Sequence, residues 1–132
     1  MTTNHIISDF VARINNALQK DKKTVLVPRT NKIKNLLNVM EQEGFIVGYQ
    51  DKVEDKKFNV FLKYFQDKPV INNFSSISKP SRRVYFSKKD IMQWKTQNST
   101  FDLLIISTNK GVLTHQDSLS KGAGGEVLVS IN

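Results

Sequence analysis

The spacing of apolar residues changes along the chain from a helical period to a strand-like alternation, and this change restricts the fold class. Residues 5–20 and 30–44 carry apolar side chains at intervals of three and four, as amphipathic helices do. Residues 24–28 form a short apolar run that ends in proline, and residues 45–65 contain two alternating runs around a charged turn at 52–57. The first half therefore predicts the element order α-β-α-β-β.

The second half of the chain is mostly strand-like. Its expected strands are "RRVYF", "FDLLIIS" and "EVLVSI", with a short helix or irregular arm at 87–100 and a short helix near 114–121. Residues 67–83 are rich in turn formers and mark a boundary. The sequence therefore predicts an α/β (α+β) fold of two small lobes: an N-terminal α-β-α-β-β lobe over 1–66 and a C-terminal lobe of mostly antiparallel β-structure over 84–132.

Net charge narrows the class of partner. Twenty Lys and Arg against 12 Asp and Glu give a formal net charge of +8, which favours a polyanion such as nucleic acid over an anionic membrane surface. Without cysteine the chain has no disulfide, thiolate metal site or cysteine nucleophile. No apolar run approaches the ~20 residues that span a bilayer. We expect no membrane partner, no metal and no cofactor; a merely basic protein is the alternative.

Small polar groups gather in two turns near the C-terminus, in a stretch with almost no net charge. An apolar strand ends in hydroxyl and amide groups, and a glycine-rich turn precedes the last strand; the candidate residues are Ser107, Thr108, Asn109, Lys110, Gly124, Gly125 and Glu126. Two such turns at one sheet edge would present donors and acceptors that suit the shape and unpaired bases of a structured RNA. Ordinary hairpin closure and helix capping fit the same residues.

Basic residues gather at three further places. In "ISKPSRRVY", Lys79, Arg82 and Arg83 precede Tyr85, an arrangement suited to phosphate contact and base stacking. Solvent-exposed positions of the first helix carry Arg13 and Asn16, and the second helix starts with Lys32 and Lys34. Each set is explained equally well as ordinary surface residues that contact only solvent.

Catalytic groups are sparse. His5 and His115 stand 110 residues apart, and we expect His115 to be a surface residue at a helix start. Ser107 lies in no nucleophile elbow and Gly122–Gly125 lack the P-loop spacing. We expect no catalytic residue; a small hydrolase using Ser107 and His115 is the competing class. Trp94 is expected to anchor the two lobes against each other.

Taken together, these stretches resemble the universal small-subunit ribosomal protein eight family from end to end. "ISDFVARINNAL" resembles its first helix, "EQEGFI" the end of its second helix, and "ISKPSRRVY" its basic hairpin. "IISTNKGVLT" and "GAGGE" resemble its C-terminal signature, the most specific element. The sequence departs from the family pattern at Asn109, where serine is usual, over His115–Ser120, and at its Ile131-Asn132 end.

The resemblance implies a structural protein that binds a stem with an unpaired core in the central domain of small-subunit ribosomal RNA, beside other small-subunit proteins. By the same resemblance the two C-terminal turns make the principal RNA contact, Lys110 touches phosphate, and the basic helix positions are secondary contacts. A regulator that binds a messenger stem of similar shape outside the ribosome is the alternative. Abundant lysine, asparagine and isoleucine and the lack of a transit helix favour a mitochondrial ribosome, with plastid or bacterial ribosomes as alternatives.

Overall fold

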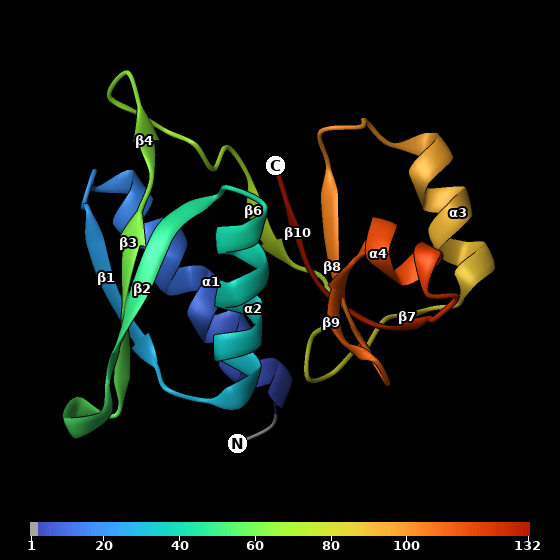
Figure 1. The fold of residues 1–132 in the computed structure, drawn as a ribbon, viewed down its shortest axis with the longest axis horizontal. Coiled ribbons are helices and arrows are strands. Elements are labelled where there is room, and N and C mark those ends of the chain that lie inside the picture. The colour runs from blue at the N-terminus through green and yellow to red at the C-terminus, as the bar shows by residue number, and fades with distance from the viewer. Residues whose placement is uncertain (1–2) are drawn as a thin grey trace. The chain divides into compact units, whose positions relative to one another are not determined.

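The computed structural model describes residues 3–132, with side chains from residue 6 onward, and shows an α+β protein that divides into two compact units, residues 1–72 and 73–132 (Figure 1). We call them the N-terminal and C-terminal units and describe each by itself. The segment 67–83, expected as a boundary, is shared between them. Its strand β5 (Lys68–Pro69) pairs with β4 (Tyr64–Phe65) in the first unit, and β6 (Phe74–Ser76) belongs to the second.

The N-terminal unit has the expected α-β-α-β-β order. Its main elements are α1 (Thr3–Gln19), β1 (Thr24–Pro28), α2 (Asn31–Gln42), β2 (Ile46–Lys52), a 3-10 turn η1 (Val53–Asp55) and β3 (Lys57–Leu62). The antiparallel sheet has the order β1-β3-β2, so β1 is an edge strand. Both helices lie on the same side of this sheet (Figure 1).

Side-chain periodicity explains how the helices bury one face. Phe10 and Ile14 of α1, one turn apart, are fully buried, as are Ile33 and Leu37 of α2. Thr30 caps α2, because its hydroxyl accepts a hydrogen bond from the Ile33 amide at 3.2 Å.

The C-terminal unit is built on a five-stranded antiparallel sheet. Its further elements are β7 (Tyr85–Phe86), α3 (Lys88–Gln97), β8 (Leu103–Thr108), β9 (Gly111–Thr114), α4 (His115–Ser120) and β10 (Gly125–Ile131). The strand order is β6-β10-β8-β9, and β7 also pairs with β10. The expected strand "RRVYF" is only two residues long here, and β9 lies where the sequence indicated no strand.

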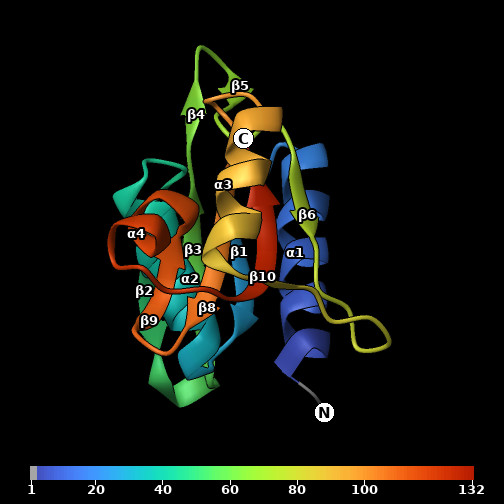
Figure 2. The same cartoon turned by 90° about the vertical axis from the view of Figure 1, so that its right-hand side faces the viewer.

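Helices α3 and α4 cover one face of the sheet, as Figure 2 shows. The buried core on this face contains Ile91 of α3, Leu104 and Ile106 of β8, and Val127 of β10. Trp94 packs against this cluster, so the described contacts place it in the core of its own unit rather than in the expected inter-lobe position.

His115 corrects a second expectation, because its side chain is buried rather than at the surface. It is only 3% exposed, and its Nδ1 accepts a hydrogen bond from the Leu104 amide at 3.3 Å. Its ring meets Trp94 edge to face at a centroid distance of 4.9 Å. The cause is tertiary: α4 packs on β8 beside α3, which covers the helix start that the sequence pattern would leave exposed.

The C-terminal end is fixed in the unit by packing and hydrogen bonds. Ile131 is 1% exposed. Asn132 exchanges backbone hydrogen bonds with Asn73, and its Nδ2 donates to Asp102 Oδ1 at 2.7 Å. A branched aliphatic side chain and an amide clamp therefore hold this end of the chain in place. Within residues 3–132, no helix combines the length and apolar character needed to cross a bilayer.

Burial lowers the pKa of His115, and the nearby Lys95 ammonium acts in the same direction. The unfolded chain, with the ordinary pKa of 6.5, therefore binds more protons than the folded chain just below that pH. We expect the contribution of His115 to the free energy of unfolding to be constant above pH 6.5. Below that pH, the free energy of unfolding should fall as the pH drops. Urea titrations followed by Trp94 fluorescence at several pH values between 5 and 8 measure this loss.

The control is His115→Gln, which has no charge to gain. This variant is expected to be less stable at neutral pH but to lose the pH dependence just below 6.5. An equal pH dependence in wild type and variant would contradict the assignment to His115.

Candidate nucleic-acid interface

Strand register brings the two C-terminal turns together at one end of the sheet. In β10, Gly125 lies opposite Thr108 of β8 and Glu126 lies opposite Ser107. On the other side of β10, Glu126 lies opposite Tyr85 of β7. Residues directly opposite on neighbouring strands project to the same face. Ser107, Glu126 and Tyr85 therefore form one row across three strands, which we call the polar row.

The polar row lies on the face that α3 and α4 do not cover. Alternation along β8 places Ile106 toward the helices, so the neighbouring Ser107 projects to the opposite face. Tyr85 is 62% exposed and presents its ring to solvent. Oε2 of Glu126 is buried and has no hydrogen-bond partner among the described residues. The row thus combines a hydroxyl, a carboxylate and an exposed aromatic ring, which together suit an unpaired base.

The glycines serve this arrangement by letting strands approach one another. A Cβ on Gly125 would lie 2.0 Å from the Ser107 carbonyl oxygen, and one on Gly124 would lie 2.5 Å from the Phe86 carbonyl oxygen. These distances are far shorter than van der Waals contact, so only glycine fits at either position. Gly124 therefore admits the backbone of β7, and Gly125 admits that of β8.

Thr108 and Lys110 are engaged within the chain. The Thr108 hydroxyl donates to the Gly111 carbonyl at 2.8 Å and accepts from the Lys110 amide at 3.1 Å, which closes the turn that contains Asn109. Lys110 Nζ donates to the Lys121 carbonyl at the end of α4, at 2.8 Å. Thr108 therefore shapes the hydroxyl turn, and Lys110 ties that turn to the helix that leads into the glycine turn.

Ser118 is a structural residue that the sequence analysis missed. It is fully buried and its hydroxyl donates to the Ala123 carbonyl, while the Ala123 amide donates back to the Ser118 carbonyl at 2.9 Å. These bonds hold the glycine turn against α4. A serine within a short helix carries no pattern that would have revealed this role.

The basic hairpin leads directly into β7. Lys79 and Arg82 exchange two backbone hydrogen bonds, and the buried Ser78 hydroxyl bonds both the amide and the carbonyl of Val84. The Val84 carbonyl also accepts from the Val127 amide of β10 at 2.9 Å. The exposed side chains of Lys79, Arg82 and Arg83 are therefore held on a fixed turn that continues into the strand carrying Tyr85.

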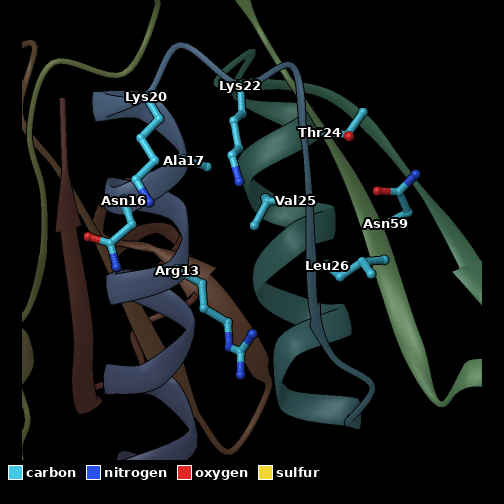
Figure 3. A pocket seen from close by; sticks show the side chains of 9 residues that line it. All are labelled: Arg13, Asn16, Ala17, Lys20, Lys22, Thr24, Val25, Leu26 and Asn59. Carbon is cyan, nitrogen blue, oxygen red and sulfur yellow. The ribbon is translucent and has the colours of Figure 1, made fainter.

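The remaining candidate residues lie in the N-terminal unit, in two different places. Arg13 and Asn16 of α1 line a cleft beside β1 (Figure 3). Lys34 lines a different cleft, at the start of α2 with Arg29, and Lys32 is half-buried on the same helical turn. Arg29 there pairs with Asp51, Nε to Oδ1 at 2.6 Å, and this hydrogen bond lowers the pKa of the Asp51 carboxyl.

The hydrolase hypothesis has no support in this geometry. The His115 ring is buried and its Nδ1 accepts the Leu104 amide, whereas Ser107 projects to the sheet face away from the helices. Among the described residues, no group of three or more His, Cys, Asp or Glu side chains is placed to hold a metal ion.

Comparison with known proteins identifies one family along nearly the whole chain. A sequence model of the family described as Ribosomal protein S8 matches residues 5–132. Curated relatives described as small ribosomal subunit protein uS8 include those of Mycoplasmopsis agalactiae, 40% identical over 95% of both chains, and of Vesicomyosocius okutanii, 41% identical over 99% of both. The relative from Campylobacter jejuni subsp. doylei is 38% identical over 97% of this chain and 98% of its own.

The chain therefore belongs to the ribosomal protein S8 family, which confirms the resemblance seen in the sequence.

Gly125→Ala should destabilise the C-terminal unit, because its methyl group would collide with the Ser107 backbone rather than with a movable side chain. Overpacking of this kind costs about 1–3 kcal/mol. Urea denaturation followed by circular dichroism measures the loss.

Gly48→Ala in β2 is the matched control. Its new Cβ would meet only the Glu41 carboxylate oxygen at 2.9 Å, and that flexible side chain can move. The control should change stability by less than about 1 kcal/mol. Equal losses in the two variants would contradict the role given to Gly125.

Proposed function

We propose that this protein is a structural component of the small ribosomal subunit and has no catalytic activity. It binds a stem with an unpaired core in the central domain of small-subunit ribosomal RNA, supports the folding of that domain, and lies beside other small-subunit proteins. Membership of the ribosomal protein S8 family supports the ribosomal role. The single observation that carries RNA recognition is the polar row, in which strand pairing places Ser107, Glu126 and Tyr85 side by side.

The row supplies selectivity because its groups act by direction and fit rather than by net charge. The Glu126 carboxylate accepts hydrogen bonds from base amino or ribose hydroxyl groups, and an anion there disfavours a phosphate at the same position. Tyr85 offers a flat surface on which an unpaired base stacks, a contact worth about 1–3 kcal/mol. A regular duplex presents neither a free base face nor the same edges.

The basic residues supply affinity with little selectivity. Lys79, Arg82 and Arg83 extend the contact to phosphates next to Tyr85, and Arg13, Asn16, Lys32 and Lys34 add contacts from the N-terminal unit. Each cation that replaces a counterion on the RNA adds to binding and to its dependence on salt. Within the row's own turns, Asn109 adds an amide, and Lys110 adds an ammonium already hydrogen-bonded to the Lys121 carbonyl.

The decisive experiment compares two RNAs at one salt concentration: the central-domain stem, and a fully paired duplex of equal length that lacks the unpaired core. We expect clearly tighter binding to the stem, because only the stem offers groups that match the polar row. Equal affinities would refute shape-selective recognition. Co-sedimentation of the protein with small ribosomal subunits at high salt separates the ribosomal role from binding to a free messenger.

Ser107→Ala should weaken binding to the stem by about 1–3 kcal/mol, because a buried RNA group loses its hydrogen-bond partner. Binding to the paired duplex should change little. Lys79→Ala is the contrasting variant. It should weaken binding to both RNAs and reduce the slope of log affinity against log salt concentration by about 1. The assignment of the row fails if Ser107→Ala affects stem and duplex equally.

We place this ribosome in a mitochondrion, on the bias of the sequence toward lysine, asparagine and isoleucine. The curated relatives named above are bacterial, so a bacterial ribosome is the alternative. Co-purification of the protein with ribosomes from isolated mitochondria supports the proposal, and its recovery only with bacterial ribosomes refutes it.

A further inference from the structure

His115 lies in the middle of the segment that joins the two polar turns of the C-terminal unit. This segment leaves the hydroxyl turn as β9, whose Val112 lies opposite Ser107, and it reaches the glycine turn at the end of α4. His115 is the first residue of α4 and follows Thr114, whose hydroxyl accepts from the Asp117 amide at 3.2 Å. A shift of His115 would therefore displace the start of the helix that leads into the glycine turn.

The imidazole fastens α4 to the strand that carries Ser107. Nδ1 of His115 accepts a hydrogen bond from the Leu104 amide of β8, and the side chain is buried. A ring nitrogen that accepts a hydrogen bond carries no proton, so the buried ring is neutral. A proton on Nδ1 would point at the Leu104 amide hydrogen, remove this hydrogen bond and leave a charge in a buried position. The present packing of α4 on β8 is therefore compatible only with the neutral ring.

The same ring is connected to the strand that carries Tyr85. Helix α4 lies beside α3 (Figure 2), and His115 meets Trp94 of α3 edge to face. Trp94 also lines a cleft together with Tyr85 and Phe86 of β7. One buried side chain thus contacts β8 directly and borders, through Trp94, the strand that supplies the aromatic member of the polar row.

The far end of α4 holds both polar turns. Ser118, three residues after His115, donates its hydroxyl to the Ala123 carbonyl and so fixes the glycine turn. The Lys121 carbonyl accepts from Lys110 Nζ, which fixes the hydroxyl turn. Because α4 is only six residues long, its start and its end cannot move independently. The position of His115 therefore sets the positions of both turns.

The charges around the ring oppose its protonation. The elements packed on α4 are α3, β8 and β9, and neither strand carries a titratable side chain. The charged residues of α3 are Lys88, Lys89, Asp90 and Lys95. Burial lowers the pKa of His115, and the Lys95 ammonium lowers it further, while Asp117 is the acidic residue of α4 itself. The folded protein therefore keeps the ring neutral at neutral pH and takes up the proton only below pH 6.5.

We propose that His115 is a positioning residue for the polar row, whose neutral ring holds β8, α3 and α4 in the arrangement that fits RNA. When the ring takes up a proton from solvent, α4 shifts, the two turns loosen and the stem is released. Contacts between the basic residues and phosphates do not require this arrangement, so binding to a regular duplex is retained. The inference rests on the proposed function for the identity of the RNA.

The test measures binding of the full chain to the central-domain stem and to the fully paired duplex between about pH 5.5 and 8 at fixed ionic strength. We expect a constant stem affinity above pH 6.5 and a fall below it by at most about tenfold per pH unit, the limit for one proton. Duplex affinity should stay level. Circular dichroism at each pH monitors the fold, and a loss of stem affinity that only follows unfolding would overturn the proposal.

Two variants of His115 separate the proton from the hydrogen bond. His115→Gln keeps an acceptor for the Leu104 amide but does not titrate, so its stem affinity should be constant over the whole pH range. His115→Leu has no acceptor and should bind the stem more weakly than His115→Gln at every pH. The matched control is His5→Gln, which removes the other histidine of the chain and should keep the wild-type pH profile. A wild-type pH profile in His115→Gln would overturn the proposal.

Proton NMR of His115 in the His5→Gln protein tests the coupling without changing residue 115. Because binding and protonation oppose each other reciprocally, the stem should lower the pKa of the His115 imidazole. An unchanged or raised pKa in the complex would overturn the proposal. Failure of the proposed function is distinguishable, because wild type would then show no preference for the stem over the duplex at pH 8. A preference that does not depend on pH would refute the role of His115 alone.

Discussion

The close approach of β10 to both of its neighbours at Gly124 and Gly125 is the contact on which the functional end of the C-terminal unit depends. The Ser107 carbonyl occupies the space where any side chain at position 125 would begin. Only because the strands come this near does Glu126 lie opposite both Ser107 and Tyr85. A wider spacing would separate the hydroxyl, carboxylate and ring that form the polar row.

Alternation along β8 then divides neighbouring residues between two tasks. Ser107 projects to the face opposite α3 and α4, whereas Thr108 uses its hydroxyl to close the turn through Gly111 and Lys110. The sequence presents Ser107, Thr108 and Asn109 as one polar run, and from composition they are equivalent. The strand assigns them different environments, since successive residues face opposite sides of a sheet.

The sequence predicted the features that depend on local pattern. Helical periodicity was sufficient to predict α2, and the polar turns were recognised as one cluster. The rest depends on tertiary contacts. His115 has the local pattern of an exposed helix start, and it is buried because α3 brings Trp94 against it. The strand β9 follows a turn and is four residues long. Four residues are too few for the alternation of a strand to be distinguished from the irregular pattern of a loop. No local sequence pattern shows that the space beside Gly125 is filled by a strand of the same chain.

Under the proposed function, the separation of the polar row from the basic residues has a physical reason. Attraction between cations and phosphates extends over about 8 Å at physiological salt and is nearly the same for every RNA sequence. If cations filled the polar row, the tightest contact would be available to any phosphate backbone. A carboxylate at Glu126 makes such a contact unfavourable, while Ser107 and Tyr85 favour an RNA that offers a hydrogen-bonding edge and an unstacked base. Net charge then determines how strongly RNA is attracted, and the row determines which RNA remains bound.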